Sequence, residues 1–145
     1  MPVFELFLQL PLFKGIESED LFALIPKISL DFENYQEGEF VFKKGNKPEG
    51  VIFLLKGKVK LVDDDFSKEF SGSCLLSFTG LFGDENLYYS DALSLTDVRI
   101  LIIDTKSLLY LFRQNENILC NYLDLLSEIG DSRNNIKLLD RLRKR

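Results

Sequence analysis

Glycine-bearing turns divide the middle of the chain into short apolar runs, and this division limits the fold more than any other feature. The turns are expected at residues 38–39, 45–48 and 56–58. Between them lie runs such as 40–42 and 51–55, which are rich in Phe, Val, Ile and Leu. Short strands at close spacing with turn residues between them are typical of an antiparallel barrel or roll. We therefore predict a fold of the α+β class that is mainly β.

Helical patterns flank this predicted roll. Ser18 is expected to cap a helix with acids in its first turn, and Asp104 or Thr105 to cap a later one. Residues 1–114 would form the roll with its flanking helices, and 115–145 one long helix of the same domain. The expected helices are 3–10, 18–26, 106–113 and 115–145, and the expected strands are 28–33, 40–42, 51–55, 59–62, 70–78, 92–95 and 99–103.

The composition excludes most catalytic and metal chemistry. The chain of 145 residues has no histidine and two cysteines, which excludes the usual zinc sites, haem ligation by histidine and histidine-assisted nucleophiles. Cys74 and Cys120 are expected to be reduced, buried thiols, and a redox role for them stays open. The acids 63–65 are expected at a solvated hairpin tip, because consecutive side chains on a strand do not converge on one ion. We expect neither a metal nor an enzymatic activity.

The termini carry the signals that bear on location and charge. The start of the chain lacks the basic head of a secretory signal, and no apolar run approaches the roughly 20 residues that span a bilayer. We therefore expect a cytoplasmic protein. The net charge is −5, yet residues 137–145 contain five basic residues and one acid. These basic residues indicate either that the chain leads into a further segment or that they complement the dipole at the end of a helix, and the sequence leaves both interpretations open.

A second glycine pattern, at residues 78–86, suggests a ligand site. Gly80 and Gly83 indicate a tight turn, and Asp84 and Glu85 follow directly. Exposed backbone N–H groups in such a loop attract anions, and carboxylates accept hydrogen bonds from sugar hydroxyls. The alternative is an ordinary solvated turn, with acids that bind nothing.

The last segment shows a heptad pattern. Apolar positions step by four and three residues, which is typical of a helix that pairs with a second copy across a two-fold axis. The alternative is that this stripe packs on the chain's own roll, and Leu119, Leu126 and Leu138 form a second apolar face. We favour one face on the roll and one on a partner. The predicted dimer seam consists of Ile118, Tyr122, Leu125, Ile129, Ser132, Ile136 and Leu139.

Taken in order, these segments resemble one known family. The matching residues are 11–15, 38–46, 51–61, 82–84 and 101–104. They resemble the effector domain of the Crp/Fnr superfamily of bacterial transcription regulators, which is the cyclic-nucleotide-binding β-roll. The resemblance implies a double-stranded β-helix, or jelly-roll-like roll, with N-terminal helices and a long C-terminal helix. It also implies a homodimeric, non-enzymatic domain that senses a small effector.

The resemblance places the ligand site in residues 78–91, which we call the cassette. Family members that bind a cyclic nucleotide carry Phe-Gly-Glu there, followed by an Arg for the phosphate and by Ser or Thr. Here Asp84 replaces that Glu, the Arg position falls on Ser90, and the Ser/Thr position falls on Asp91. The cation is therefore missing and an acid is nearby. The ligand residues that the resemblance implies are Phe82, Gly83, Asp84, Glu85, Ser90 and Asp91, with Arg133 and Asn134 from the long helix.

These departures leave the effector open. Cyclic AMP and cyclic GMP are candidates, but a phosphate without its Arg and next to a carboxylate would bind poorly. Another small anionic effector, or none, is favoured, and Arg133 is the first candidate for a substitute cation. The alternative to a sensor is a ligand-free scaffold that only dimerises. A cupin-like enzyme is disfavoured, because such enzymes hold a metal through histidines.

The family also implies a DNA-binding partner domain. Its members continue past the long helix into a helix-turn-helix domain, and this sequence ends near the expected boundary. We expect either an excised sensory domain or a stand-alone roll. Contact with DNA would come only through a helix-turn-helix domain that is not present in this chain.

Overall fold

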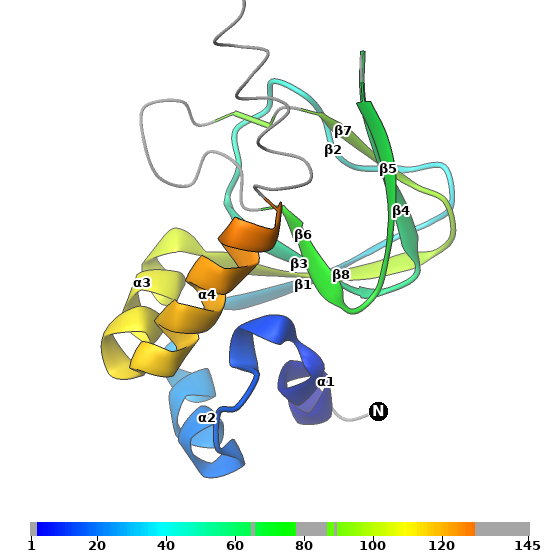
Figure 1. The fold of residues 1–145 in the computed structure, drawn as a ribbon. Helices are drawn as coiled ribbons and strands as arrows, with labels where there is room; N and C mark the ends of the chain where they lie inside the picture. The colour runs from blue at the N-terminus through cyan, green and yellow to red at the C-terminus, as the bar shows by residue number, and fades with distance from the viewer. Residues whose placement is uncertain (1–2, 65, 78–86, 89, 130–145) are drawn as a thin grey trace, which may run out of the picture.

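The computed structural model describes residues 3–64, 66–77, 87–88 and 90–129, and shows a β-roll with helices packed on one side (Figure 1). Two four-stranded antiparallel sheets form the roll. Strands that are distant in sequence lie side by side in both sheets, as in a jelly roll. This confirms the predicted fold class.

The first sheet has the strand order β1-β8-β3-β6 and the second has β2-β7-β4-β5. β8 and β3 are the inner strands of the first sheet, and β7 and β4 are those of the second. The first sheet consists of β1 (Leu30–Tyr35), β8 (Val98–Asp104), β3 (Gly50–Lys56) and β6 (Cys74–Ser77). The second consists of β2 (Phe40–Phe42), β7 (Asp91–Ser94), β4 (Lys58–Asp63) and β5 (Phe66–Ser71).

The helices come from both ends of the chain and cover the first sheet. The Asp104 carboxylate caps α3 by accepting a hydrogen bond of 2.7 Å from the Ser107 N–H, as the sequence predicts. Ser18, by contrast, is the first residue of α2 rather than its cap, which is Glu17. The helices are α1 (Val3–Gln9), η1 (Pro11–Phe13), α2 (Ser18–Leu24), η2 (Ile25–Lys27), α3 (Thr105–Gln114) and α4 (Glu116–Ile129).

One predicted strand is wrong. The sequence predicts a single strand over 70–78, but β5 ends at Ser71 and β6 begins at Cys74 in the other sheet. Gly72 lies at this change of sheet, and a Cβ atom there would be 2.8 Å from the Leu55 carbonyl oxygen. The chain therefore crosses between the sheets at a place where only glycine fits without a shift of backbone.

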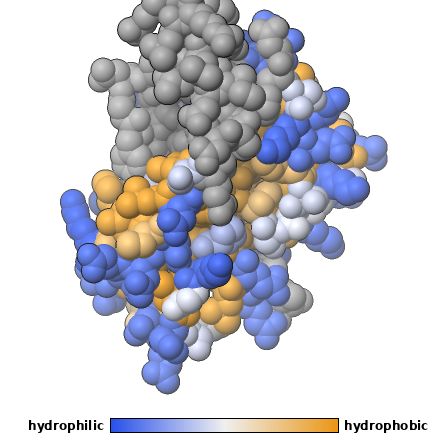
Figure 2. All heavy atoms as spheres, viewed as in Figure 1, coloured by the Kyte–Doolittle hydropathy of each residue, from blue (hydrophilic) through white to orange (hydrophobic). Residues whose placement is uncertain are grey.

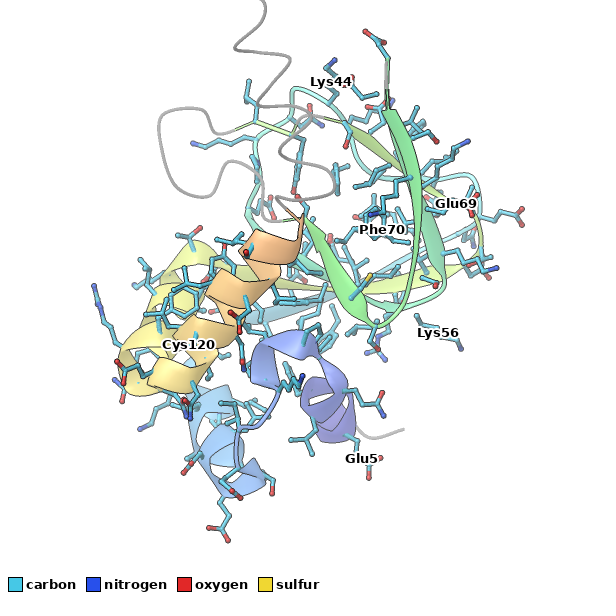
Figure 3. The ribbon with its side chains drawn as sticks, viewed as in Figure 1. Glu5, Lys44, Lys56, Glu69, Phe70 and Cys120 are labelled. Carbon is cyan, nitrogen blue, oxygen red and sulfur yellow. The ribbon has the colours of Figure 1, made fainter. Side chains whose placement is uncertain are left out.

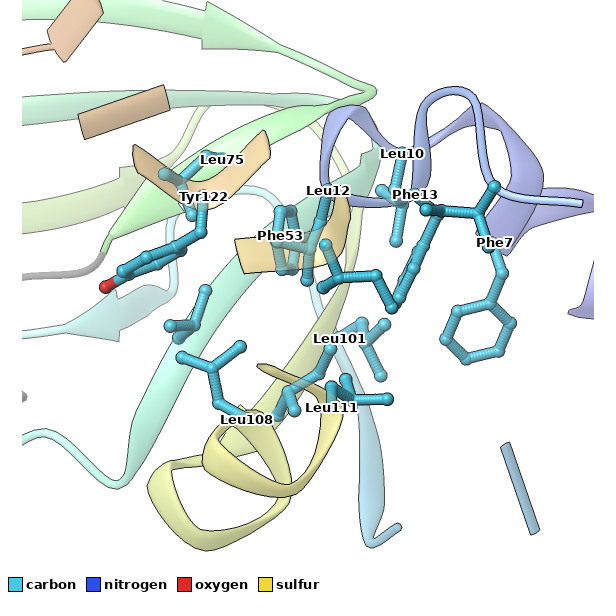
Figure 4. Packing of buried hydrophobic residues seen from close by; sticks show 14 of the residues in the cluster. Phe7, Leu10, Leu12, Phe13, Phe53, Leu75, Leu101, Leu108, Leu111 and Tyr122 are labelled. Carbon is cyan, nitrogen blue, oxygen red and sulfur yellow. The ribbon is translucent and has the colours of Figure 1, made fainter. Parts of the chain in front are cut away.

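The apolar side chains form two cores, one on each face of the first sheet. Leu101 of β8 packs with Phe53 against the helices, as Figure 4 shows, whereas Ile100 faces the space between the sheets. All three are fully buried. Because β8 is covered on both faces, its residues 100–103 form a continuous apolar run without alternation.

α4 is attached to the start of the chain by a polar contact. The side-chain amide of Asn121 donates hydrogen bonds of 2.8 Å to the carbonyl oxygens of Leu12 and Lys14. Beside it, Ile118 and Tyr122 lie in the core between helices and sheet. Burial raises the pKa of Tyr122 to about 12. Among the described residues, no helix combines the length and apolar character needed to cross a bilayer.

Candidate functional site

The cassette lies between the end of β6 and the start of β7. Its residues 78–86 and 89 are outside the part of the chain that the structure describes. Residues 130–145 lie outside it as well, so six of the predicted ligand residues are not described, whereas Ser90 and Asp91 are. The six are Phe82, Gly83, Asp84, Glu85, Arg133 and Asn134.

The entry to the cassette is fixed by the first sheet. Ser77, the last residue of β6, is 3% exposed and pairs with Ile52 of β3. Leu76 before it is fully buried between the sheets. The segment therefore leaves the roll from a rigid position.

Tyr88 fixes the exit. Its N–H donates to the Asn46 carbonyl oxygen at 2.9 Å, and its own carbonyl oxygen accepts from the Gly45 N–H at 2.9 Å. The ring stacks on Phe42, with centroids 4.0 Å apart and planes at 12°. Tyr88 thus joins the cassette to the turn after β2. Sequence reasoning missed this residue, because its partners are distant in the chain and no local pattern marks them.

Asp91 has a structural partner. It is the first residue of β7, and its Oδ1 accepts a hydrogen bond of 2.8 Å from the Lys44 N–H. The ammonium group of Lys44 lies 2.6 Å from Asp63 Oδ1, at the end of β4. Ser90, directly before Asp91, is half-buried. The positions that the resemblance assigns to Arg and to Ser or Thr thus carry a hydroxyl and a carboxylate. The ammonium group of Lys44 is paired with Asp63.

Two phenols lie in the core between the sheets near this exit. Burial raises the pKa of Tyr88 above its usual range, and the carboxylate of Glu49 adds to the effect. Burial and Glu33 raise the pKa of Tyr35 to about 12, and the Tyr35 hydroxyl donates to Glu33 at 3.3 Å. Both phenols are therefore neutral at pH 7. They can exchange hydrogen bonds with a polar ligand but cannot neutralise an anion.

A family model places the chain. The model for the cyclic nucleotide-binding domain matches residues 32–115, which is more than half of the chain. The chain belongs to this family. The matched range begins in β1 and ends after α3, so it includes most of β1, strands β2 to β8 and the cassette.

Solved structures share the fold of this cyclic nucleotide-binding domain. The Thermus thermophilus catabolite activator protein matches with a TM-score of 0.70 and 20% identity over 90% of this chain and 63% of that chain. The sensor domain of the transcriptional regulator DNR from Pseudomonas aeruginosa gives 0.70 and 21% over 89% and 86%. The regulatory subunit of a cAMP-independent protein kinase A from Trypanosoma brucei gives 0.68 and 19% over 95% and 49%.

These comparisons confirm the resemblance at the level of family and fold. The chain spans less than two thirds of the length of the catabolite activator protein chain. At such identities the likeness shows the fold alone. A comparison with curated protein sequences gives no match. The ligand residues that the resemblance implies stay predictions.

The predicted dimer seam begins on the cyclic nucleotide-binding domain's own core. Ile118 is fully buried, Tyr122 is 3% exposed, and Leu125 is partly buried against the same cluster. The first three seam residues therefore pack on the chain's own roll, which is the alternative to a dimer seam that the sequence left open. The Ile129 side chain and Ser132, Ile136 and Leu139 lie outside the described part of the chain.

The exposed side of α4 has a different character. Leu123 is 53% exposed, and Leu109 of α3 is 38% exposed. Figure 2 shows hydrophobic residues at the surface on this side of the domain, beside hydrophilic ones. The homodimer and the face of α4 that would meet a partner stay predictions.

The cysteines and acids complete the predicted positions. Cys120 is exposed on α4 (Figure 3), so its expected burial is wrong, and Cys74 is half-buried. The two are not joined by a disulfide. Asp63 ends β4 and pairs with Phe66, which confirms the hairpin, but the Asp63 side chain is paired with Lys44 rather than solvated, and Asp65 lies outside the described residues. Within the described residues, no group of three or more acids or cysteines is placed to hold a metal.

Proposed function

We propose that this domain senses a small anionic effector and has no enzymatic activity of its own. Two proteins that share its fold are, by name, a catabolite activator and the sensor domain of a transcriptional regulator. By analogy with them, the chain would be the cytoplasmic effector domain of a Crp/Fnr-type regulator. It would form a homodimer through α4 and its continuation, and DNA contact would belong to a separate domain.

The observation that supports an effector site is the fixed frame of the cassette. Ser77 holds its entry in a buried strand, and Tyr88 holds its exit by two backbone hydrogen bonds and a ring stack. A loop with both ends held by rigid elements keeps the geometry that ligand binding requires. We place the effector between this loop, contributing Phe82, Gly83, Asp84 and Glu85, and the helix side with Arg133 and Asn134.

The effector is proposed to differ from cyclic AMP and cyclic GMP. A cyclic phosphate near Ser90 would lack a bidentate cation and would meet the Asp91 carboxylate. Two like charges 4 Å apart repel by about 4 kcal/mol at an effective dielectric constant of about 20. Such a term weakens binding by several orders of magnitude unless Arg133 compensates it.

A stabilisation experiment tests the effector site. The thermal midpoint of the chain is measured with cyclic AMP, cyclic GMP, and small carboxylate and phosphate metabolites, each added alone. We expect one of the metabolites, but neither cyclic nucleotide, to raise the midpoint. Gly83→Trp should abolish that rise, whereas Leu87→Trp, at an exposed cassette residue that is not among the predicted ligand residues, should leave it. An unchanged rise in the Gly83 variant would overturn the site.

A ligand-free scaffold is the second candidate function. It is favoured by the exposed Leu123 on α4, an apolar residue that a partner helix would cover. A stable dimer at micromolar concentration, with no ligand that raises the thermal midpoint, would select the scaffold over the sensor.

A further inference from the structure

An open pocket of about 700 Å³ lies at the end of the roll where β1 ends and β8 begins. Its walls come from the turn after β1, from the end of β3 and from the start of β8. Charged and amide side chains dominate the lining, which includes Asn34, Gln36, Glu39, Lys56, Asp97 and Arg99.

The charged groups of the pocket are distant from the cassette entry, although Tyr35, which also lines the pocket, contributes to the raised pKa of Tyr88 at the cassette exit. Lys56 and Arg99 pair across β3 and β8, whereas the cassette leaves the sheet at Ser77, opposite Ile52. Four residues of strand separate Ile52 from Lys56, or about 13 Å at roughly 3.3 Å per residue. Figure 3 shows Lys44, whose turn holds the cassette exit, and Lys56 at opposite ends of the roll.

Arg99 points to an oxyanion. Its Nε is buried and has no hydrogen-bond partner among the residues that the structure describes. The guanidinium carbon lies 5.0 Å from the centre of the Phe32 ring, which supports the group without accepting that hydrogen bond. Arginine stays charged at any ordinary pH, and its Nε edge suits the two oxygens of a carboxylate. A carboxylate in the pocket would supply the missing acceptor.

Two carboxylates line the same pocket. Glu39 accepts from the Gln36 N–H at 2.7 Å, and Asp97 accepts from the Glu37 N–H at 3.0 Å. Each carboxylate thus gives one oxygen to a backbone N–H. Where the chain is described, no ion pair joins these acids to Lys56 or Arg99. The lining therefore holds charges of both signs that do not neutralise one another by contact.

The rim of the pocket is held in place without a ligand. The Gly38 N–H donates to the Ser94 carbonyl oxygen at 2.8 Å and fixes the turn after β1. Gly57 has φ +96°, and a Cβ atom there would collide with the Asp97 carbonyl oxygen. The residues that carry the charges are thus positioned by backbone contacts, which lowers the entropy lost on binding.

We propose that this pocket is a second ligand site that takes a small zwitterion of the amino-acid class. The carboxylate of the ligand binds Arg99 and Lys56, and its ammonium group binds Glu39 and Asp97. The lining has two groups of each sign, so a simple anion or cation would be repelled as much as attracted. A zwitterion satisfies both sets. The site is independent of the effector proposed for the cassette.

Amide NMR of the full 145-residue chain tests the proposal. The standard L-amino acids are titrated one at a time, with succinate as the anion-only probe and putrescine as the cation-only probe at matched ionic strength. At least one amino acid should shift the amides of 36–39 and 97–99 and the Arg99 Nε signal, at about tenfold lower concentration than either control. No shift with any amino acid, or equal shifts with succinate or putrescine, would overturn the proposal.

Variants identify the groups responsible. Arg99→Gln should weaken binding by about tenfold or more, and so should Glu39→Gln, which keeps an oxygen for the Gln36 N–H. The matched control is Lys68→Gln, because Lys68 also lies over an aromatic ring, 5.3 Å from Phe70, but outside the pocket. Undiminished binding in the Glu39 variant would contradict the site. Loss of binding in Gly83→Trp would contradict its separation from the cassette.

Discussion

Tyr88 stacks on Phe42 at the exit of the cassette, with ring centroids 4.0 Å apart and planes at 12°. The pair connects the end of the cassette to β2 and lies in the core between the two sheets. The stack is thus both part of the core and part of the frame of the candidate site. Changes at Tyr88 should affect stability and ligand response together.

Tyr88→Ala should lower the free energy of unfolding by about 3 kcal/mol, because it leaves a cavity in the core between the sheets. Tyr88→Phe keeps the stack and should cost less than about 1 kcal/mol. Urea unfolding followed by circular dichroism measures both values. Equal stability of the alanine variant and the native chain would show that the stack does not hold the cassette exit.

Asn121→Ala should lower the free energy of unfolding by about 1–3 kcal/mol, because the carbonyl oxygens of Leu12 and Lys14 lose their donor. Asn117→Ala, on the exposed side of α4, is the control and should change it by less than about 0.5 kcal/mol. If both variants lower the free energy of unfolding equally, the hydrogen bonds of Asn121 do not contribute specifically to stability.

The chain should lose stability at alkaline pH. The folded-state pKa of Tyr122 is raised by burial to about 12, against about 10 in an unfolded chain. The folded state therefore favours the neutral phenol, and this contribution is complete below pH 10 and lost as the pH rises towards 12. Thermal midpoints measured across this range should fall, and Tyr122→Phe should fall less steeply. A midpoint independent of pH would refute the assignment.

A double change at the cassette should create cyclic AMP binding. Ser90→Arg with Asp91→Thr installs a bidentate cation and removes the acid, while the Thr hydroxyl can still accept from the Lys44 N–H. Affinity for cyclic AMP should rise by about tenfold or more over the native chain. The matched control, Ser67→Arg with Glu69→Thr on the exposed positions of β5, should have no effect. The same gain in both variants would mean that charge alone attracts the nucleotide.

Substitutions at the two ends of the predicted dimer seam should have different effects, one on folding and the other on dimerisation. Ile118→Asp places a charge in the core and should unfold the domain. Ile136→Asp, at the predicted far end of the seam, should leave the roll folded but convert the dimer to a monomer. Sedimentation equilibrium at micromolar concentration measures this, with circular dichroism as the folding control. A native chain that is monomeric there would rule out the dimer.

Local patterns in the sequence predict much of the fold. The glycine turns correctly indicate a roll of short strands. The run over 99–103 correctly indicates a buried strand, because β8 is covered on both faces and its sequence needs no alternation of apolar and polar residues. The change of sheet at Gly72 was missed, since it depends on the approach of the distant Leu55 backbone. Periodicity also showed that α4 has apolar faces. It could not show that Ile118 packs on the chain's own core, because a stripe does not specify its partner.

The candidate site was less predictable than the fold, because its contacts join residues that are distant in the sequence. Ser90 and Asp91 could be singled out from the resemblance, but the hydrogen bond from Lys44 to Asp91 depends on the folded turn. Tyr88 carries no local signal, because its partners Gly45 and Phe42 come from another part of the chain. The pocket around Arg99 likewise arises only when three strand ends meet.

The most direct measurement is isothermal titration of the reduced native chain with cyclic AMP, repeated with cyclic GMP. The resemblance puts Ser90 and Asp91 at the positions of the cation and the hydroxyl that bind a cyclic phosphate, so we predict no binding heat below about 1 mM for either nucleotide. A dissociation constant in the micromolar range would contradict this prediction. It would mean that another cation, with Arg133 as the first candidate, rebuilds the phosphate site.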